Sequence, residues 1–362
     1  MNEKLLVLKF NTILDLNNIS HISTFEFYNF IKLFKEEYNY DVYTLTDVER
    51  PNNDTFNYVL MDNYDNLLSL VNENFKKIVV VCGLMQNSKY NKILYNLIND
   101  FKGEIYFLIT DILLLPTDNE SLKLTNNNIN LISTLFNDEE DMKIYLENTQ
   151  GVFKNYKNIS IYQFYLELYK NSLFKPKRCP SVKDKLDYCY FGGYRRGERN
   201  KKLKKYVFNE EVIKNLSIDI YGNITQEHVK EINDKIDPSS LSLKGYVDNS
   251  KITSKLCNYR TSILINDDNS KNRGYVFRIF EIIFSNCVIL VDEESFDKDL
   301  LFSSKDLIDF SYIKDTTELI DKVLKLRDEK FYKHIVTLQR AEFLKKINSY
   351  KLRGMITKGN LN

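Results

Sequence analysis

The feature that most constrains the fold is an alternation of two kinds of segment along almost the whole chain. Short runs of β-branched and aromatic residues, each the length of one strand, alternate with longer amphipathic stretches. Such alternation is typical of parallel sheets covered by helices on both faces. In the first half, strands are predicted at residues 5–10, 41–45, 58–61, 78–82, 105–109 and 159–164, and helices at 24–37 and 64–74.

A break in this alternation divides the chain. Residues 171–185 contain Pro176 and Pro180 and show little periodicity, which is typical of a linker. Because 362 residues are too many for one ordinary core, two domains are expected. After the break the alternation restarts, with predicted strands at 188–191, 218–221, 243–247, 262–265 and 288–291 and predicted helices at 197–208, 225–234, 276–284, 317–327 and 332–350.

Two open α/β units in succession predict a cleft, with ligands beyond the carboxyl ends of the strands. The 51 Lys and Arg residues nearly cancel the 50 Asp and Glu residues, so any anion-binding surface must be local. No apolar run approaches the roughly 20 residues of a membrane span, and no signal-peptide pattern is present. The five cysteines form no CxxC pair and the three histidines lack zinc-ligand spacing, so we expect a cytoplasmic protein and assign no metal ligand.

Residues 190–205, YFGGYRRGERNKKLKK, combine a strand end with a basic helix start. A predicted strand ends at Gly192 and Gly193, and Arg195 and Arg199 follow where a helix is expected to begin. Glycines let a ligand approach the backbone, a helix start offers N–H groups to anions, and arginines four residues apart share a helix face. The combination favours a phosphate site over a solvated basic helix, whereas the lysines at 201–205 are expected to serve solvation or weak DNA steering.

Two further segments place an acidic residue where a ligand would bind. In NRGYVFRIFE, Arg278 and Glu281 lie three residues apart, so a cation for a diphosphate and a carboxylate for ribose hydroxyls would share a helix face. A surface ion pair explains that spacing equally well. In IYFLITDILLLP, Asp111 follows an apolar predicted strand, as a helix cap, which is the commoner role, or as a general base in a cleft.

Taken together, these segments resemble the DNA β-glucosyltransferases of T-even bacteriophages. The resemblance runs from about residue 23 to about residue 340, with low identity overall and dense identity within the motifs. Agreement at several segments, in order and at similar separations, is more specific than any single motif. The matching segments are EIYFLITDILLLP at 104–116, LDYCYFGGYRRGER at 186–199, SIDIYGN at 217–223, FRIFEIIFSNCVILVDEE at 277–294 and TELIDKVLKL at 317–326.

The resemblance implies a GT-B fold, in which two Rossmann-like domains face a central cleft with their parallel sheets. It implies an acceptor domain over residues 1–175, a nucleotide-sugar domain over 176–335, and a helix within 336–362 that packs back toward the first domain. The residues that match the family's functional positions are Asp111 as catalytic base, Arg195, Arg199 and Arg278 on the diphosphate, Glu281 on the ribose, Val247 with its backbone at the uracil, and Gly192, Gly193 and Gly222 in turns at the donor.

The resemblance also implies a reaction. It is an inverting transfer of glucose, or a related sugar, from UDP-glucose to the hydroxymethyl group of 5-hydroxymethylcytosine or 5-hydroxymethyluracil in double-stranded phage DNA, with the base flipped out. We expect a monomer in the cytoplasm of the infected bacterium, with Mg²⁺ or Mn²⁺ as an optional assisting cation. Two alternatives stay open: a GT-B glycosyltransferase acting on a polysaccharide, lipid or protein, and a non-catalytic binding protein on the same scaffold.

This chain departs from the family's pattern in three places. Gly193 stands where the family has Ser, and Arg196 stands where it has a small residue. The family has an acidic residue on its first helix, at the sugar end of the cleft, where an ungapped alignment places Phe25; the adjacent Glu26 is therefore the candidate sugar or acceptor contact. DNA contact is expected from a local basic patch, with Lys201, Lys202, Lys204, Lys345 and Lys346 as its candidates.

Overall fold

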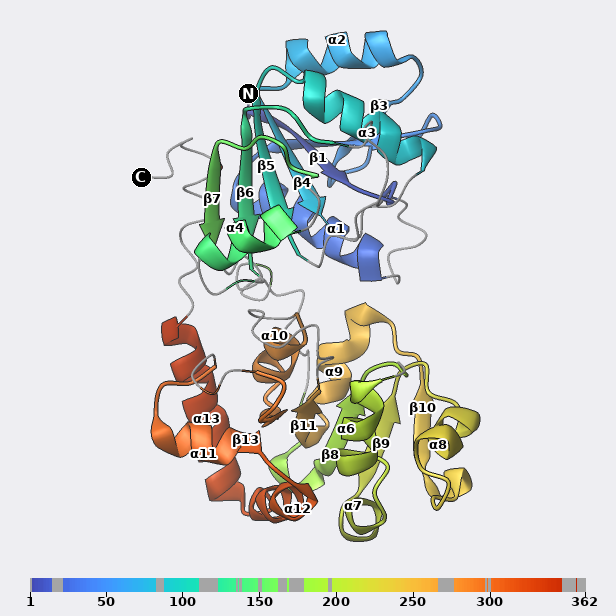
Figure 1. Ribbon diagram of the computed structural model, residues 1–362, viewed down its shortest axis with the longest axis vertical. Helices are drawn as coiled ribbons and strands as arrows, with labels where there is room; N and C mark the ends of the chain where they lie inside the picture. The colour runs from blue at the N-terminus through green and yellow to red at the C-terminus, as the bar shows by residue number, and fades with distance from the viewer. Residues whose placement is uncertain are drawn as a thin grey trace. The chain divides into compact units, whose positions relative to one another are not determined.

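The computed structural model describes residues 2–14, 22–82, 88–110, 123–134, 136, 139–148, 152–161, 168, 179–194, 197–265, 277–296, 298, 301–346 and 356. The chain divides into two compact units, Met1–Leu168 with Ser349–Asn362 and Tyr169–Asn348 (Figure 1). The predicted domain boundary at residue 175 falls outside the described residues. That boundary and the predicted packing of the C-terminal segment stay predictions.

The first unit is built on one sheet of seven parallel strands, in the order β3-β2-β1-β4-β5-β6-β7. The central strand β4 is buried along its whole length, as expected for a sheet covered on both faces. The six strands predicted in this half are confirmed, and β6 is additional; its short run INLIS is preceded by three consecutive asparagines, which obscure the pattern. The bounds are β1 Lys4–Lys9, β2 Asp41–Thr46, β3 Asn57–Leu60, β4 Lys77–Cys82, β5 Glu104–Ile109, β6 Ile129–Ser133 and β7 Asn158–Ile161.

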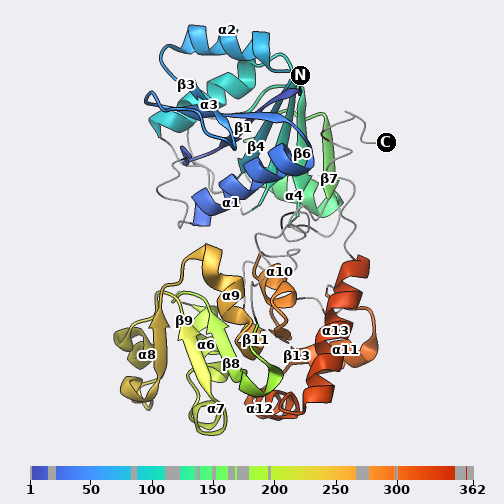
Figure 2. The same cartoon turned by 180° about the vertical axis from the view of Figure 1, so that it is seen from behind.

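Helices cover both faces of this sheet. Apolar residues of α2, α3 and α4 share one buried cluster with the strands, while α1 lies on the opposite face (Figure 2). Helices α2 and α3 begin at side-chain caps, where Asn63 accepts from the Asp65 N–H and Ser88 accepts from the Asn91 N–H. The bounds are α1 Ile22–Lys32, continued by a π-helical turn η2 Leu33–Glu37, α2 Tyr64–Asn74, α3 Lys89–Asp100 and α4 Glu139–Asn148.

The second unit has its own sheet of six parallel strands, in the order β10-β9-β8-β11-β12-β13. All five predicted strands are present, and the additional β13 has only two residues, too few for a periodic pattern. The predicted α/β class with two parallel sheets is therefore confirmed. The bounds are β8 Leu186–Phe191, β9 Ile218–Tyr221, β10 Ser242–Gly245, β11 Tyr259–Leu264, β12 Val288–Asp292 and β13 Tyr312–Ile313.

The helices of the second unit form two layers. Residues of α6, α7, α8 and α12 join one buried cluster with the strands. On the sheet's other face, α9 and α10 contact β11, and α10 and α13 contact β12. The bounds are α6 Glu198–Tyr206, α7 Glu210–Asn215, α8 Gln226–Ile232, α9 Ile252–Leu256, α10 Phe277–Phe284, α11 Lys305–Ser311, α12 Thr316–Lys325 and α13 Glu329–Lys346, with 3-10 turns η4 Val182–Asp184, η5 Pro238–Ser240 and η6 Asn249–Lys251.

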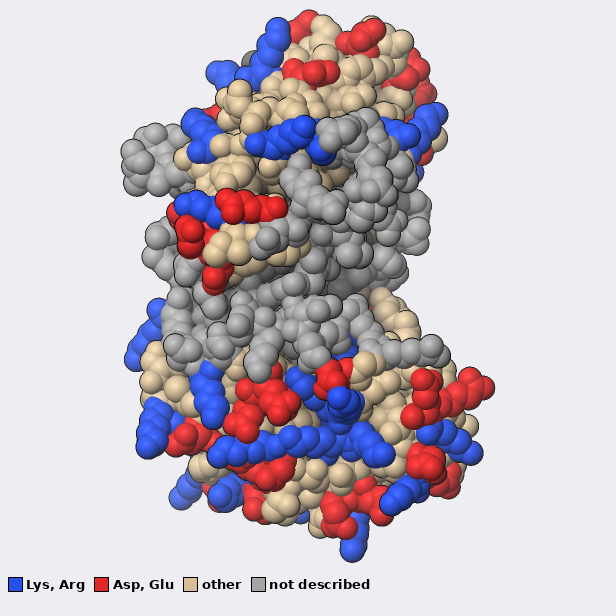
Figure 3. All heavy atoms as spheres, viewed as in Figure 1, with Lys and Arg blue, Asp and Glu red and all other residues tan. Residues whose placement is uncertain are grey.

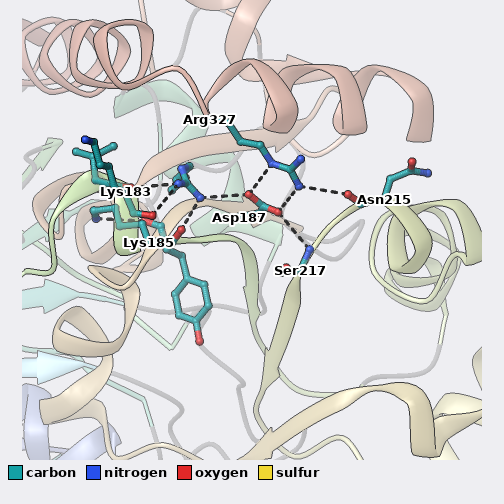
Figure 4. A network of polar contacts seen from close by, with 9 residues as sticks. Lys183, Lys185, Asp187, Asn215, Ser217 and Arg327 are labelled. Carbon is teal, nitrogen blue, oxygen red and sulfur yellow. Dashed lines mark hydrogen bonds and ion pairs between the residues drawn. The ribbon is translucent and has the colours of Figure 1, made fainter.

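A network of polar side chains around the buried Asp187 lies at the amino edge of this sheet (Figure 4). Arg327 binds Asp187 through two hydrogen bonds, 3.1 Å from Nε to Oδ1 and 2.7 Å from Nη2 to Oδ2. Arg260 Nη1 lies 3.2 Å from Asp187 Oδ1, and the Ser217 N–H donates to Oδ2. Burial alone would raise the pKa of Asp187, but its hydrogen bonds with Arg327 and Ser217 and the charges of both arginines hold that pKa below its usual range. The network ties the starts of β8 and β11 to the segment after α12.

Candidate functional site

Two glycines bring the carboxyl ends of β8 and β9 into close contact. A Cβ at Gly222, where φ is +129°, would lie 1.9 Å from the Gly192 carbonyl oxygen, and a Cβ at Gly192 would lie 2.2 Å from Tyr190 Oη. The Gly192 N–H donates to the Tyr221 carbonyl at 3.0 Å, and the Gly222 N–H donates to the Gly245 carbonyl at 2.9 Å. A Cβ at Gly193 would meet nothing within 4 Å. The turn after β8 therefore has a backbone that a ligand can approach.

Helix α6 begins directly after this turn. Gly197, with φ of +99°, is its N-terminal capping position, and Arg199 lies in its first turn. The N–H groups at such an end are not used by the helix and favour anions. Arg195 and Arg196 lie outside the described residues, so the predicted sharing of one helix face by Arg195 and Arg199 stays a prediction.

Arg278 and Glu281 form an ion pair on α10, with 2.5 Å between Arg278 Nη1 and Glu281 Oε2. The pair is not confined to the surface, because the Glu281 side chain is only 2% exposed and that of Arg278 is 24% exposed. Burial raises the pKa of Glu281 to about 7, and the charge of Arg278 partly offsets that rise. Nη1 and Oε2 are in direct ionic contact, and among the described residues no further donor is hydrogen-bonded to Oε2. The buried carboxylate thus has a single charged partner, and a ligand's hydroxyl would add a hydrogen bond that the described residues do not supply.

Two stacked aromatic rings extend from this pair along the strand ends. Arg278 lies over the ring of Phe191, 5.6 Å from guanidinium carbon to centroid, and Phe191 stacks on Tyr221 at 4.3 Å and 12°. Phe191 and Tyr221 are the last residues of the neighbouring strands β8 and β9. Tyr221 Oη lies 2.7 Å from Tyr259 Oη. The two rings, both buried, form a stacked aromatic layer beside the two charged groups.

Tyr221 also lines a cavity of about 480 Å³. It contains Val247, which the resemblance assigns to the uracil, and the backbone there leaves β10 after Gly245. Its wall mixes aromatic rings with opposite charges, and the volume suits one small ring system. The lining residues are Asp219, Tyr221, Lys244, Tyr246, Val247, Asp248, Lys251 and Lys255.

The inner face of α6 carries a second buried ion pair, which corrects one prediction. Lys202 Nζ lies 3.0 Å from Asp292 Oδ2 and 3.0 Å from Ser295 Oγ, and the lysine side chain is only 7% exposed. Assigning Lys202 to a DNA-contacting patch is therefore wrong, because its charge is neutralised beneath α6. Its neighbour Lys201 is 74% exposed and pairs with Glu198.

Of the residues predicted in the first unit, the structure places Glu26 near the carboxyl edge of the sheet. Asp111 lies outside the described residues; Thr110, just before it, donates from Oγ1 to the Cys82 carbonyl at 2.6 Å. Glu26 on α1 accepts from Lys9 Nζ at 2.6 Å, and Lys9, at the end of β1, has a side chain only 3% exposed. Phe25 is buried. Glu26 therefore neutralises a buried lysine, and its contact with a sugar or acceptor stays a prediction.

Positive and negative charges are mixed on the surface of each unit, as the face seen in Figure 3 shows. Among the described residues, no group of three His, Cys, Asp or Glu side chains lies close enough to hold a metal ion. Asp297 and Asp299, which form an Asp-Lys-Asp run in the sequence, lie outside the described residues. No helix within the described ranges combines the length and apolar character that crossing a bilayer requires.

The stacked rings of Phe191 and Tyr221 were not identified from the sequence. A signal for them was present, since an aromatic residue ends each of two predicted strands, 188–191 and 218–221. The parallel register of β8 and β9 places Phe191 opposite Tyr221, and that register is not contained in either segment alone. The burial of Glu281 had no local signal, because it depends on which elements pack against α10.

No family model matches the chain. The sequence is 25% identical to the DNA β-glucosyltransferase of Enterobacteria phage T4 over 243 residues, which cover 63% of this chain and 64% of that protein, just under two thirds of its length. A solved structure of the T4 phage β-glucosyltransferase superposes with a TM-score of 0.70 at 18% identity, covering 98% of each chain. The resemblance to this phage protein is confirmed as homology, and the GT-B-like fold is confirmed with it.

Two more distant structures share the fold. An α-glucosyltransferase in complex with UDP and a 13-mer DNA containing a HMU base has a TM-score of 0.64 at 10% identity, over 99% of each chain. The Anabaena protein HepE, in complex with UDP and glucose, has a TM-score of 0.58 at 10% identity, over 99% of each chain. Structures of the T4 phage protein exist with UDP-glucose and with UDP and Mn²⁺.

Proposed function

We propose that this chain is an inverting glycosyltransferase that transfers glucose from UDP-glucose to the hydroxymethyl group of a modified base in double-stranded DNA. The observation that carries the proposal is the buried Glu281 carboxylate, whose Oε2 has Arg278 as its one charged partner among the described residues. The pair lies beside the stacked rings of Phe191 and Tyr221 at the carboxyl edge of the second sheet, where ligands of such folds bind.

The donor's three parts match three features of this edge. The uracil would enter the cavity at Val247, and the ribose hydroxyls would donate to Glu281. The diphosphate would bind Arg278 and Arg199, together with Arg195 and the open turn at Gly192, Gly193 and Gly222. These cations would stabilise the charge that develops on UDP as it leaves.

The reaction needs one base. Asp111 would take the proton of the acceptor hydroxyl while its oxygen bonds to the anomeric carbon, and the bond from that carbon to UDP breaks on the opposite face. One displacement inverts the configuration and yields a β-linkage. The target base must leave the duplex to reach the site, because its hydroxymethyl group is otherwise enclosed.

The acceptor and the assisting cation are supported by relatives. The name of the T4 relative and the DNA in the α-glucosyltransferase complex favour a DNA acceptor with 5-hydroxymethylcytosine or 5-hydroxymethyluracil. The likeness to HepE keeps a non-DNA acceptor as the second candidate. The side chains proposed to bind the diphosphate are cationic. Mg²⁺ or Mn²⁺ would therefore bind through the diphosphate itself, and no protein ligand is assigned. We propose a monomer acting in the cytoplasm of the infected cell.

The test uses labelled UDP-glucose and three matched duplexes, with 5-hydroxymethylcytosine, 5-hydroxymethyluracil or unmodified bases. We expect label only in modified DNA, and a β-linkage in the product by NMR. Release of UDP without labelled DNA would favour another acceptor. Absence of UDP binding by calorimetry would overturn the donor assignment itself.

Replacement of the proposed base separates chemistry from binding. Asp111→Asn should lower kcat by about 10²–10⁴-fold, the usual contribution of a general base. The Kd for UDP should stay within about twofold, because the proposed donor contacts lie in the second unit and binding is set by those contacts. The matched control is Asp62→Asn, an exposed carboxylate of the same unit. Equal loss of kcat and UDP affinity would assign Asp111 a structural role.

A further inference from the structure

An aromatic pair joins the glycine-rich turn after β8 to helix α8. The rings of Tyr194 and His228 are stacked, with centroids 4.0 Å apart and planes inclined by 6°. Tyr194 follows Gly193 directly and precedes Arg195. It also packs against the buried cluster formed by α6, α7, α8 and α12. The ring therefore lies between the core of the second unit and the turn proposed to bind the diphosphate.

The histidine ring is held in its orientation by the cap of α8. Thr225 Oγ1 accepts from the His228 N–H at 3.4 Å, and His228 Nδ1 accepts from the Thr225 N–H at 3.2 Å. This reciprocal capping box leaves the imidazole unable to rotate without loss of a backbone hydrogen bond. One face of the ring is thereby presented to Tyr194.

The tyrosine is held at a second point. Its hydroxyl donates to Glu231 Oε1, one helical turn beyond His228 on α8. A face contact and a hydroxyl contact together fix both the position and the tilt of the Tyr194 ring. Both contacts come from α8, which neither the sequence motif nor the proposed donor contacts include.

We propose that Tyr194 and His228 are positioning residues that hold the turn after β8, at Gly192 and Gly193, in its donor-binding shape. The inference rests on the proposed function, since it assigns the pair to the proposed diphosphate site. The turn needs such a support because it contains Gly192 and Gly193, and glycines lose the most conformational freedom on ordering. A turn ordered during folding does not have to be ordered again when the donor binds, which increases affinity.

The test measures UDP affinity by calorimetry and the donor KM and kcat with a modified duplex. Tyr194→Leu removes the ring, and His228→Gln removes the stack but keeps an acceptor for the Thr225 N–H, as Gln does at this capping position. Each should raise the UDP Kd and the donor KM about threefold to tenfold, the usual effect of one aromatic pair, with kcat at saturating donor within about twofold. Tyr194→Phe keeps the stack and loses the Glu231 contact, so its effect should be smaller than that of Tyr194→Leu.

The double variant decides whether the stack itself matters. Tyr194→Leu with His228→Gln should weaken UDP binding no more than the stronger single variant, because both remove one contact. The matched control is His334→Gln on α13, an exposed histidine outside the proposed site, with unchanged Kd. If Tyr194→Leu fails to fold, as judged by thermal unfolding, His228→Gln still tests the stack.

Two results would overturn the inference in different ways. If the unaltered protein binds UDP and His228→Gln binds it equally well, the stack has no positioning role while the proposed function stands. A lower kcat with unchanged KM would likewise contradict a role in donor binding. If the unaltered protein does not bind UDP at all, the proposed function and this inference fail together.

Discussion

Two acid–arginine clusters occupy opposite edges of the same sheet in the second unit, and they are built differently. At the amino edge, Asp187 receives two guanidinium groups and a backbone N–H. At the carboxyl edge, Glu281 has only Arg278 within ion-pair distance among the described residues. Both carboxylates are buried. Yet the pKa of Asp187 is lowered, while burial raises that of Glu281 to about 7.

The difference indicates which edge stabilises the fold and which edge is the candidate for binding. A buried carboxylate whose oxygens are all occupied stabilises the fold as long as it stays charged. A buried carboxylate with a single partner costs stability, and a site retains such a group when a ligand supplies further hydrogen bonds. The amino edge is therefore structural and the carboxyl edge is the candidate binding site. The following predictions test that contrast, beginning with the largest effect.

Asp187→Ala should lower the free energy of unfolding by about 3–5 kcal/mol at pH 7, because it leaves Arg260 and Arg327 without their carboxylate. Urea unfolding measures the change. Because the pKa of Asp187 is lowered in the fold, its stabilisation is present above the pKa of an unfolded Asp, about 4, and is lost as pH falls further. UDP affinity of the folded protein should not change; a change in Kd would place this edge in the binding machinery.

Glu281→Gln should stabilise the ligand-free protein above neutral pH, whereas Asp187→Ala destabilises it. The folded pKa is about 7 and the ordinary value is 4.5, so the free energy of unfolding should fall as pH rises between them. Removing the titrating group should abolish that slope and stabilise the protein at pH 8 by up to about 3 kcal/mol. Urea unfolding from pH 4 to 8 tests this, and UDP binding should weaken in the same variant. An unchanged slope would show that Glu281 is not the group that titrates.

Arg278→Met should weaken UDP binding about 10-fold to 100-fold, the usual contribution of a charged hydrogen bond. At pH 6, where Glu281 with its pKa of about 7 is mostly protonated, the free energy of unfolding should change by less than about 1 kcal/mol, because the thioether can still pack on Phe191. Calorimetry with UDP and urea unfolding measure both. Lys298→Met, at an exposed pair with Glu293, is the control. A large loss of stability with unchanged Kd would make Arg278 a structural residue like Arg260.

Lys201→Met should change the free energy of unfolding by less than about 0.5 kcal/mol, because its pair with Glu198 is exposed. If Lys201 contacts DNA, the slope of log K against log salt should fall by about one unit. Filter binding to a modified duplex at several salt concentrations measures the slope. An unchanged slope would remove Lys201 from the proposed patch, as burial already removes Lys202.

Local patterns were enough to predict most elements of the sheets. The alternation of strand-length runs and amphipathic stretches predicted eleven of the thirteen strands, all but β6 and β13. Residues 190–199 predicted a strand, a glycine turn and a helix start, and β8, Gly192 and α6 follow in that order. These features are local, because a strand or a helix start depends on the residue types within about ten positions.

The chemistry of the candidate site was decided by tertiary structure. Arg278 and Glu281 were equally compatible with a surface pair until the packing of α10 buried the carboxylate and raised its pKa. Lys202 belongs to the same basic run as Lys201, yet Asp292, about 90 residues away, neutralises its charge, and Ser295 accepts a hydrogen bond from it.

The sequence by itself therefore determined the α/β architecture, the place of the glycine turn after β8 and the likeness to the phage T4 protein. Only the tertiary structure decided which charges are buried, which rings stack and which carboxylate has a single charged partner. The physical reason is that desolvation and stacking depend on neighbours brought together from distant parts of the chain, as His228 is brought to Tyr194. No periodicity within one segment contains that information.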